Sequence, residues 1–263
     1  MGHPEWTELL SELDGCAQAG QRITFWLRDD DAVAVTEPLE RLLELAGEWA
    51  VPVVLAVIPV AAGPALATRL GKLAQVRVAA HGFAHCNHAP ATEKKQELGG
   101  HRPAQTVLDE ISTGLDRLGG RFAGQAVPML VPPWNRIAPQ LVPRLPPIGV
   151  RYLSAFGPAR SRQPVPGLVQ VDCQLDIIDW RGTRGSLPHE LLAGRLAAVV
   201  RERAAAPPDP IGILSHHLVH DDAAWRFLAH LFRLTARHPA VTWDWPLQFA
   251  DDLPVRNSAC RER

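Results

Sequence analysis

The sequence predicts an α/β protein built on a parallel sheet, in the form of a complete or deformed (β/α) barrel of about seven strands. Short and almost continuously apolar runs recur along the chain, which is typical of parallel strands buried on both faces. Amphipathic helical patterns separate these runs, as crossover helices do in such folds. The length of 263 residues suits one barrel, and we expect residues 1–263 to form a single domain.

The strand and helix patterns alternate in a regular order. Strands are expected at 23–27, 52–58, 76–80, 126–131, 150–154, 168–171 and 211–214. Helices are expected at 36–49, 63–73, 103–118, 139–145, 188–206 and 221–237. Thr36 has the chemistry of an N-cap, and Pro38 suits a first helical turn. Polar segments 87–102 and 157–167 contain Pro and Gly and are predicted to be long loops within the same domain.

Composition excludes several classes of protein. The formal net charge is -1 and charged residues are mixed along the chain, so no electrostatic signal for nucleic acid or an anionic membrane is present. No apolar run reaches the about 18 residues of a membrane span, and the first residues lack a signal-peptide pattern, which leads us to expect a soluble, cytoplasmic protein. The four cysteines form no CxxC pair and predict no disulfide framework.

Two short polar segments follow the first and third predicted strands. Arg28-Asp29-Asp30-Asp31 ends one apolar run, and His81-Gly82-Phe83-Ala84-His85 ends the other. Two neutral imidazoles and a carboxylate are a ligand set for Zn²⁺ or a similar ion, with positions left open for water. The bland interpretation is that HxxxH arises by chance among 11 histidines and that the acidic run is a solvated turn.

Three further polar clusters follow later strands: Val131-Pro132-Pro133-Trp134-Asn135-Arg136, Asp176 to Arg181, and Leu214 to Asp221. With these five clusters in this order, the sequence resembles the NodB-type polysaccharide deacetylases. That family has an Asp-Asp pair, an HxxxH, an Arg-x-Pro-aromatic segment, an Asp/Trp segment and a Leu-x-His. The resemblance runs from Arg28 to His216 and implies a deformed barrel with a divalent metal at the carboxyl ends of its strands.

The resemblance also implies roles for individual residues. Asp30 would be the general base and Asp31 a metal ligand, with Asp29 and Asp30 as the alternative pair. His81 and His85 would be the histidine ligands. The metal is expected to be Zn²⁺, with Co²⁺ or Ni²⁺ as alternatives.

The general acid would come from the fifth cluster. The resemblance implies His216 for this role, and an imidazole titrates near working pH. His217 is the alternative, because a shift of one residue in the strand exchanges the two faces.

The third and fourth clusters would support the site. Pro133 and Trp134 match the third motif, while Trp180 would wall the pocket and Asp179 would accept a hydrogen bond from a neighbouring polar group. A turn Asp followed by a core Trp is the alternative for the last two.

Some residues depart from the family pattern. Val131 stands where the family has the Arg that orients the base, and Arg28 or Arg136 could substitute for it. His88 has no counterpart and is interpreted as a loop or substrate-contact residue. Cys86 directly follows His85 and could serve as a soft ligand.

The leading hypothesis is a metal-dependent hydrolase that removes an acyl group, most simply acetyl, from an amide nitrogen of an amino sugar or a smaller substrate. Its partner is then a small molecule or an oligosaccharide, and no oligomeric state is predicted. A second hypothesis is a carbohydrate-binding or regulatory barrel without turnover, suggested by Val131. A third treats the His and Asp clusters as caps and ion pairs on an ordinary α/β domain.

Overall fold

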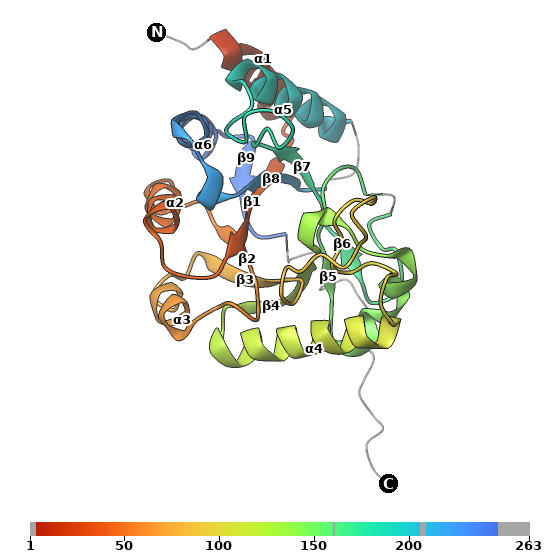
Figure 1. The fold of residues 1–263 in the computed structure, drawn as a ribbon. Coiled ribbons are helices and arrows are strands. Elements are labelled where there is room, and N and C mark those ends of the chain that lie inside the picture. The colour runs from red at the N-terminus through yellow and green to blue at the C-terminus, as the bar shows by residue number, and fades with distance from the viewer. Residues whose placement is uncertain (1–3, 160, 206–208, 247–263) are drawn as a thin grey trace.

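A curled sheet of parallel strands forms the centre of the molecule, and helices cover its outer side (Figure 1). The computed structural model describes residues 4–159, 161–205 and 209–246. The strands are β1 (Ile23–Ala32), β2 (Val53–Val57), β3 (Val76–His81), β4 (Ala126–Val131), β5 (Tyr152–Leu153), β6 (Val169–Gln170), β7 (Cys173–Asp176), β8 (Ile211–Ser215) and β9 (Val241–Trp243). The α-helices are α1 (Thr7–Gln18), α2 (Glu37–Glu48), α3 (Pro64–Leu70), α4 (Ala104–Arg121), α5 (His189–Ala204) and α6 (Asp222–Thr235).

Five short 3-10 helices complete the elements of the described residues. They are η1 (Pro4–Trp6), η2 (Pro133–Asn135), η3 (Pro139–Arg144), η4 (Pro146–Ile148) and η5 (His217–Val219). Two of them, η2 and η5, directly follow strands at the carboxyl-end face of the sheet. Within the described ranges, no helix combines the length and the apolar content that crossing a membrane requires.

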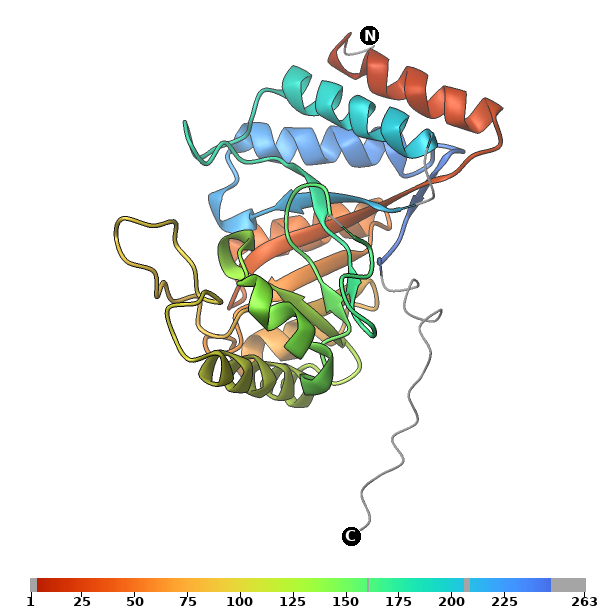
Figure 2. The same ribbon diagram turned by 90° about the vertical axis from the view of Figure 1, so that its right-hand side faces the viewer.

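The strand order confirms the predicted fold class, a deformed (β/α) barrel. The order is β6-β5-β4-β3-β2-β1-β8-β7, with β9 paired to β1, and each of these pairs is parallel. A parallel bridge between Phe156 and Cys173 links the two sides of the curl. Because the strands are parallel, their carboxyl ends share one face, which carries the long loops and lies on the left in Figure 2.

Sequence prediction and structure differ in five elements. Strand β1 was expected at 23–27 but extends to Ala32, so the Asp run lies within the strand and not after it. Helix α1 was not predicted, although Leu9, Leu13 and Cys16 are buried at helical spacing. Strands β7 and β9 were also not predicted, because each is short and lies within a polar context. The predicted helix at 139–145 is a 3-10 helix, Pro139–Arg144, since Pro143 cannot donate the hydrogen bond of a regular helix. At helix α2 the prediction is confirmed: Thr36 Oγ1 accepts the N–H of Leu39 at 3.2 Å.

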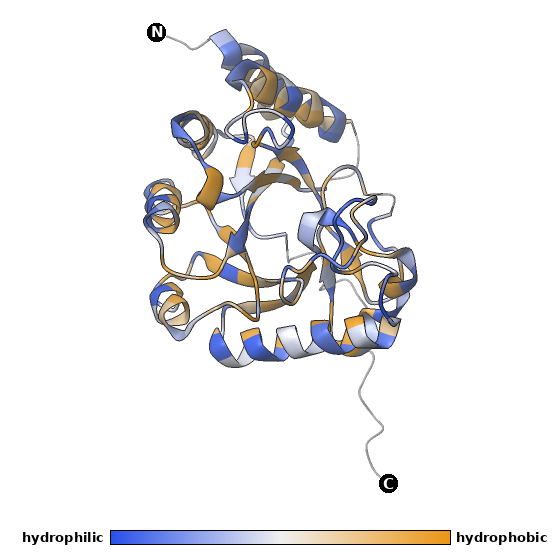
Figure 3. Cartoon of the chain, in the orientation of Figure 1, coloured by the Kyte–Doolittle hydropathy of each residue, from blue (hydrophilic) through white to orange (hydrophobic). Residues whose placement is uncertain are grey.

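The sheet separates two apolar regions. The larger one lies between the strands and the helices, and the smaller one includes Trp26, Val54, Met129 and Leu214. Since successive strand residues face opposite sides, Trp26, Arg28 and Asp30 share the side of the smaller region, and Leu27 and Asp29 share the other. In Figure 3, strand β1 changes from hydrophobic to hydrophilic toward its carboxyl end, where the Asp run lies.

Candidate functional site

The last residues of β1 place three consecutive carboxylates in three different environments. The pairing of β1 with β2 shifts register between Asp29 and Ala32, and Asp31 has a left-handed backbone with φ 73°. This irregularity breaks the alternation of the strand and turns Asp31 toward strand β3. The three aspartates therefore do not share one function or one set of partners.

Asp31 meets two histidines that come from the end of β3 and from the turn after it. Its Oδ1 atom lies 3.2 Å from Nε2 of His81 and 3.3 Å from Nε2 of His85. One ligand atom from each of the three residues lies within 4.8 Å of the others. The structure thus brings together the three residues that the sequence predicted as metal ligands.

The donor atoms of this cluster fit a divalent cation. His81 Nδ1 lies 3.0 Å from the carbonyl oxygen of Val131. A carbonyl can only accept, so Nδ1 carries a hydrogen, and Nε2 is the ring nitrogen that faces Asp31. Asp31 Oδ1 is itself buried without a hydrogen bond among the described residues. Two nitrogen atoms and one oxygen atom facing one point form a ligand set suited to Zn²⁺.

The charges around Asp31 favour its ionised form. Burial alone would raise the pKa of Asp31, but the neighbouring His81, together with His216 and His85, lowers it to about 2. For His85, burial has the opposite effect and lowers the pKa, and the neighbouring His81 lowers it further. The pKa of His81 is instead raised, because the charges of Asp30 and Asp31 outweigh the effect of burial. Metal binding requires an ionised carboxylate and neutral imidazoles, so an incoming cation would displace any proton on His81 Nε2.

Trp134 packs against the second histidine. The ring centroids of His85 and Trp134 lie 4.4 Å apart, and Lys95 Nζ lies 5.9 Å from the Trp134 ring. His85, Trp134 and Asn135 all have left-handed backbones, with φ of 55°, 56° and 57°. Unfavourable conformations of this kind persist where the surrounding structure fixes them, and they gather at functional sites.

Glu97 is a member of this region that sequence reasoning missed. It lies in the polar 87–102 loop but is only 1% exposed. Its carboxylate accepts the N–H groups of Phe83, Ala84 and Cys86 at 3.1, 2.8 and 3.3 Å. Nothing in a polar segment distinguishes a buried Glu from an exposed one, so the sequence carried no signal for it.

Arg28, and not Arg136, is the arginine that contacts Asp30. Arg28 Nε lies 2.9 Å from Asp30 Oδ1, and its Nη2 donates to Asp30 Oδ2 at 3.1 Å. The guanidinium also donates to Ser154 Oγ, to the carbonyl of Ala155 and to Asn135 Oδ1 at 2.7 to 3.1 Å. Arg136, the other candidate, donates to the carbonyl of Lys95 instead.

The two adjacent histidines after β8 face opposite sides. His216 follows the inward-facing Leu214, and its Nε2 lies 3.9 Å from Asp30 Oδ2. His217 is buried on the other side, where its Nδ1 pairs with Asp29. Asp29 also accepts the hydroxyl of Ser215 at 2.6 Å and the backbone N–H of His217 at 2.9 Å.

Asp29 and His217 form a buried ion pair. Burial opposes the charge on each, but the partner's charge prevails, so the pKa of Asp29 is lowered and that of His217 is raised. This pair ties the end of β1 to the segment after β8, while Asp30 and His216 face each other at the mouth of the barrel.

The fourth cluster contributes Trp180 and a second carboxylate. The Trp180 ring lies edge-on to His216 with centroids 4.6 Å apart, and its Nε1 donates to Asp176 Oδ2 at 2.8 Å. Asp179 accepts the backbone N–H groups of Gly182 and Thr183 and so caps a local turn. Asp176, the last residue of β7, is therefore the carboxylate next to Trp180, and recognising β7 as a strand would have pointed to it.

The remaining candidates lie outside the ligand set. Cys86 is exposed, and its thiol approaches the carbonyl of Ala84 rather than Asp31. The His88 backbone N–H donates to Gln96 within the loop. Cys16 and Cys173 are free and buried, and Cys260 lies outside the described residues.

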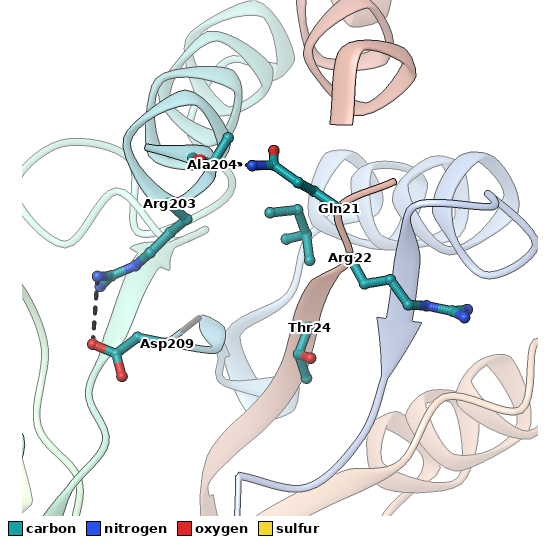
Figure 4. Close-up of a pocket in the computed structure, with 7 residues that line it drawn as sticks. Gln21, Arg22, Thr24, Arg203, Ala204 and Asp209 are labelled. Carbon is teal, nitrogen blue, oxygen red and sulfur yellow. Dashed lines mark hydrogen bonds and ion pairs between the residues drawn. The ribbon is translucent and has the colours of Figure 1, made fainter. Parts of the chain in front are cut away.

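A pocket of about 220 Å³ lies far from this chemistry. It is lined by residues around the start of β1, the end of α5 and the segment before β8, including Gln21, Thr24, Arg203 and Asp209 (Figure 4). Because the metal-ligand candidates lie at the carboxyl end of β1, this pocket is at the opposite end of the strand. It therefore contributes nothing to the candidate site.

Comparisons with known proteins agree with the fold. No protein-family profile matches the sequence, and no curated protein matches it. Among solved structures, the chain is similar to a protein from Mycobacterium smegmatis named as a polysaccharide deacetylase, with 15% identity, a TM-score of 0.60 and coverage of 81% of this chain and 76% of that one. It is also similar to the peptidoglycan deacetylase PdaC of Bacillus subtilis, with 15% identity, a TM-score of 0.50 and coverage of 81% and 84%.

These similarities establish a class of fold. The chain has the deformed (β/α) barrel of the NodB-type polysaccharide deacetylases, as the order of its five motifs predicted. At 15% identity the similarity concerns the fold, and the activity must be argued from the residues of this chain.

Proposed function

We propose that the protein is a metal-dependent hydrolase that removes an acyl group, most simply acetyl, from the amide nitrogen of an amino sugar or a related small substrate. The observation that carries the proposal is the arrangement of three groups at one barrel mouth. The Asp31, His81 and His85 cluster lies beside Asp30, and His216 stands 3.9 Å from Asp30. A ligand set, a base and an acid are the groups that amide hydrolysis needs.

Asp31, His81 and His85 would hold the ion, which we propose to be Zn²⁺, with Co²⁺ or Ni²⁺ as alternatives. When bound, such a cation polarises an amide carbonyl and acidifies water. Three protein ligands are the number typical of catalytic sites, and they would leave the ion accessible to water or substrate.

The other residues of the mouth would handle protons. Asp30, held by Arg28, takes a proton from the attacking water, whose oxygen forms the new bond to the acyl carbon. His216 gives a proton to the amide nitrogen as the C–N bond breaks, so the products are a carboxylic acid and an amine. Trp180 and Trp134 flank the two ends of this group of residues and can stack on a sugar ring.

The contacts of Arg28 weigh against the non-catalytic alternative. That alternative was motivated by Val131, which removes the Arg expected to orient the base. Arg28 reaches Asp30 from the same strand with one hydrogen bond and one further ion-pair contact. Val131 therefore does not deprive Asp30 of an arginine partner, which removes the ground for that alternative.

Acetate release tests the proposal. Zn²⁺-loaded protein is incubated with N-acetylglucosamine oligomers and with small N-acetyl amines, and acetate is measured for the wild type, Asp30→Asn and His216→Asn. We expect release by the wild type and a fall of about 10²–10⁴-fold in each variant. Binding of these compounds without any acetate release by the metal-loaded wild type would favour the non-catalytic barrel.

A further inference from the structure

We propose that Glu97 is a positioning residue for the metal centre, in that its carboxylate fixes the turn that presents His85 beside His81. The inference rests on the proposed function, because it concerns the ligands of the proposed ion. It concerns how this chain builds the site and not which residues bind the metal.

The backbone N–H groups of the turn between the two histidines take their hydrogen-bond acceptor from outside the turn. Gly82 and His85 adopt left-handed conformations with φ of 57° and 55°. The N–H groups of Phe83 and Ala84, with that of Cys86 just beyond His85, point at one carboxylate, Glu97. Hydrogen bonds from several N–H groups to one carboxylate are charge-assisted and geometrically specific. Glu97 therefore supplies the acceptor that the turn itself lacks.

The absence of a side chain at Gly82 leaves room for the Glu97 carboxylate. A Cβ atom at Gly82 would overlap Glu97 Oε2 and would come within 2.6 Å of Pro133 Cγ. The left-handed φ of Gly82 is also one that residues with side chains rarely adopt. The glycine after the first histidine, the buried glutamate and Pro133 thus form one packed unit.

The backbone of Glu97 is itself held in place. Arg102 donates to the Glu97 carbonyl at 3.4 Å and pairs with Glu110 of helix α4 at 2.7 Å. Leu98, the next residue, is fully buried, and its carbonyl accepts the N–H of Ala138 at 2.8 Å. These contacts hold the part of the 87–102 loop that carries Glu97 against helix α4 and the segment at Ala138.

This arrangement has a consequence for metal affinity. A ligand held in its binding geometry before the ion arrives loses less conformational freedom on binding. Replacement of the carboxylate by an amide would turn one acceptor into a donor that faces other donors, which frees the turn and His85. Changes in groups that orient metal ligands typically weaken metal affinity about 10–100-fold.

Glu97→Gln is the direct test, and Glu93→Gln is its matched control. Glu93 lies on the same loop, is 55% exposed at its side chain and pairs with His101. Equilibrium Zn²⁺ affinity is measured by competition with a chelator. We expect Glu97→Gln to bind about 10–100-fold more weakly than the wild type and Glu93→Gln to bind equally well. Equal affinity of Glu97→Gln and the wild type would overturn the inference and leave the proposed function intact.

A second readout does not depend on the metal. In metal-free protein, amide hydrogen exchange at residues 83–86 is compared for the wild type, Glu97→Gln, Gly82→Ala and Glu93→Gln. We expect faster exchange than in the wild type for Glu97→Gln and Gly82→Ala, and the wild-type rate for Glu93→Gln. Wild-type rates in all three variants would contradict the inference. A wild type that binds no Zn²⁺ at all would instead defeat the proposed function, and the inference with it.

Discussion

Arg28 and Asp30 form a buried ion pair within one strand, with Arg28 Nε 2.9 Å from Asp30 Oδ1. Residues two apart on a strand share a face, so the pair needs no contribution from a neighbouring segment. Burial would lower the pKa of Arg28, but the charge of Asp30 outweighs it and keeps the guanidinium charged. The strand that carries the proposed base thus also carries the group that orients it.

Replacement of this arginine should impair catalysis more than metal binding. Arg28→Lys keeps the charge but loses the two-point contact with Asp30. We expect kcat to fall about 10–100-fold, because a base displaced by even 1 Å loses much of its effect, with Zn²⁺ affinity unchanged. Arg136→Lys is the matched control, since Arg136 contacts the Lys95 carbonyl and not Asp30. Equal kcat values for the two variants would contradict the positioning role.

The adjacent histidines after β8 should separate into one that acts in catalysis and one that stabilises the fold. His216→Asn should lower kcat about 10²–10⁴-fold with little change in thermal stability. His217→Asn leaves the buried Asp29 without its counter-charge and should cost about 3 kcal/mol of the free energy of unfolding. Chemical denaturation and acetate release, measured on both variants, check this division. The reverse pattern would mean that His217 faces the substrate.

His220 should make the protein less stable in mild acid. Its two ring nitrogens are buried without hydrogen bonds among the described residues, and burial lowers its pKa to about 4, below the usual 6.5. Between these values the unfolded chain binds a proton that the folded chain does not. Stability therefore rises with pH across this window and falls as pH drops from 6.5 to 4, by about 3 kcal/mol in all.

The difference between wild type and His220→Gln isolates this effect from other titrating groups. The pKa of Asp29 is lowered and that of His217 is raised, so these two groups change stability below and above the pH range from 4 to 6.5. We expect the free energy of unfolding, from urea titrations at several pH values, to fall less in acid for the variant. Parallel pH profiles for the two proteins would show that His220 is not held neutral in the fold.

Periodicity accounts for the part of the fold that sequence predicted. The apolar runs of β2, β3 and β4 were placed within a residue or two because strands buried on both faces read as continuous apolar segments. The cap at Thr36 follows from local chemistry. Strands β7 and β9 were missed because pairing with neighbours, and not their own composition, defines them.

The candidate site was predictable in its members but not in its register. The resemblance of the five polar strand ends to the family motifs implied Asp31, His81, His85 and His216, with a shift of one residue left open for the aspartate and for His216. Only the β-bulge at the end of β1 shows which aspartate turns toward the histidines, and a sequence does not reveal a bulge. The contact of Glu97 with the HxxxH turn likewise depends on how a long loop folds back.

Metal content tests the central claim most directly. Wild type, His81→Ala and the control His88→Ala, whose histidine lies outside the ligand cluster, are loaded with Zn²⁺, freed of excess and measured by elemental mass spectrometry. We predict about one ion per chain in the wild type and in His88→Ala, and almost none in His81→Ala. A wild type that retains no ion, or a His81→Ala variant that retains as much as the wild type, would contradict the proposed metal site.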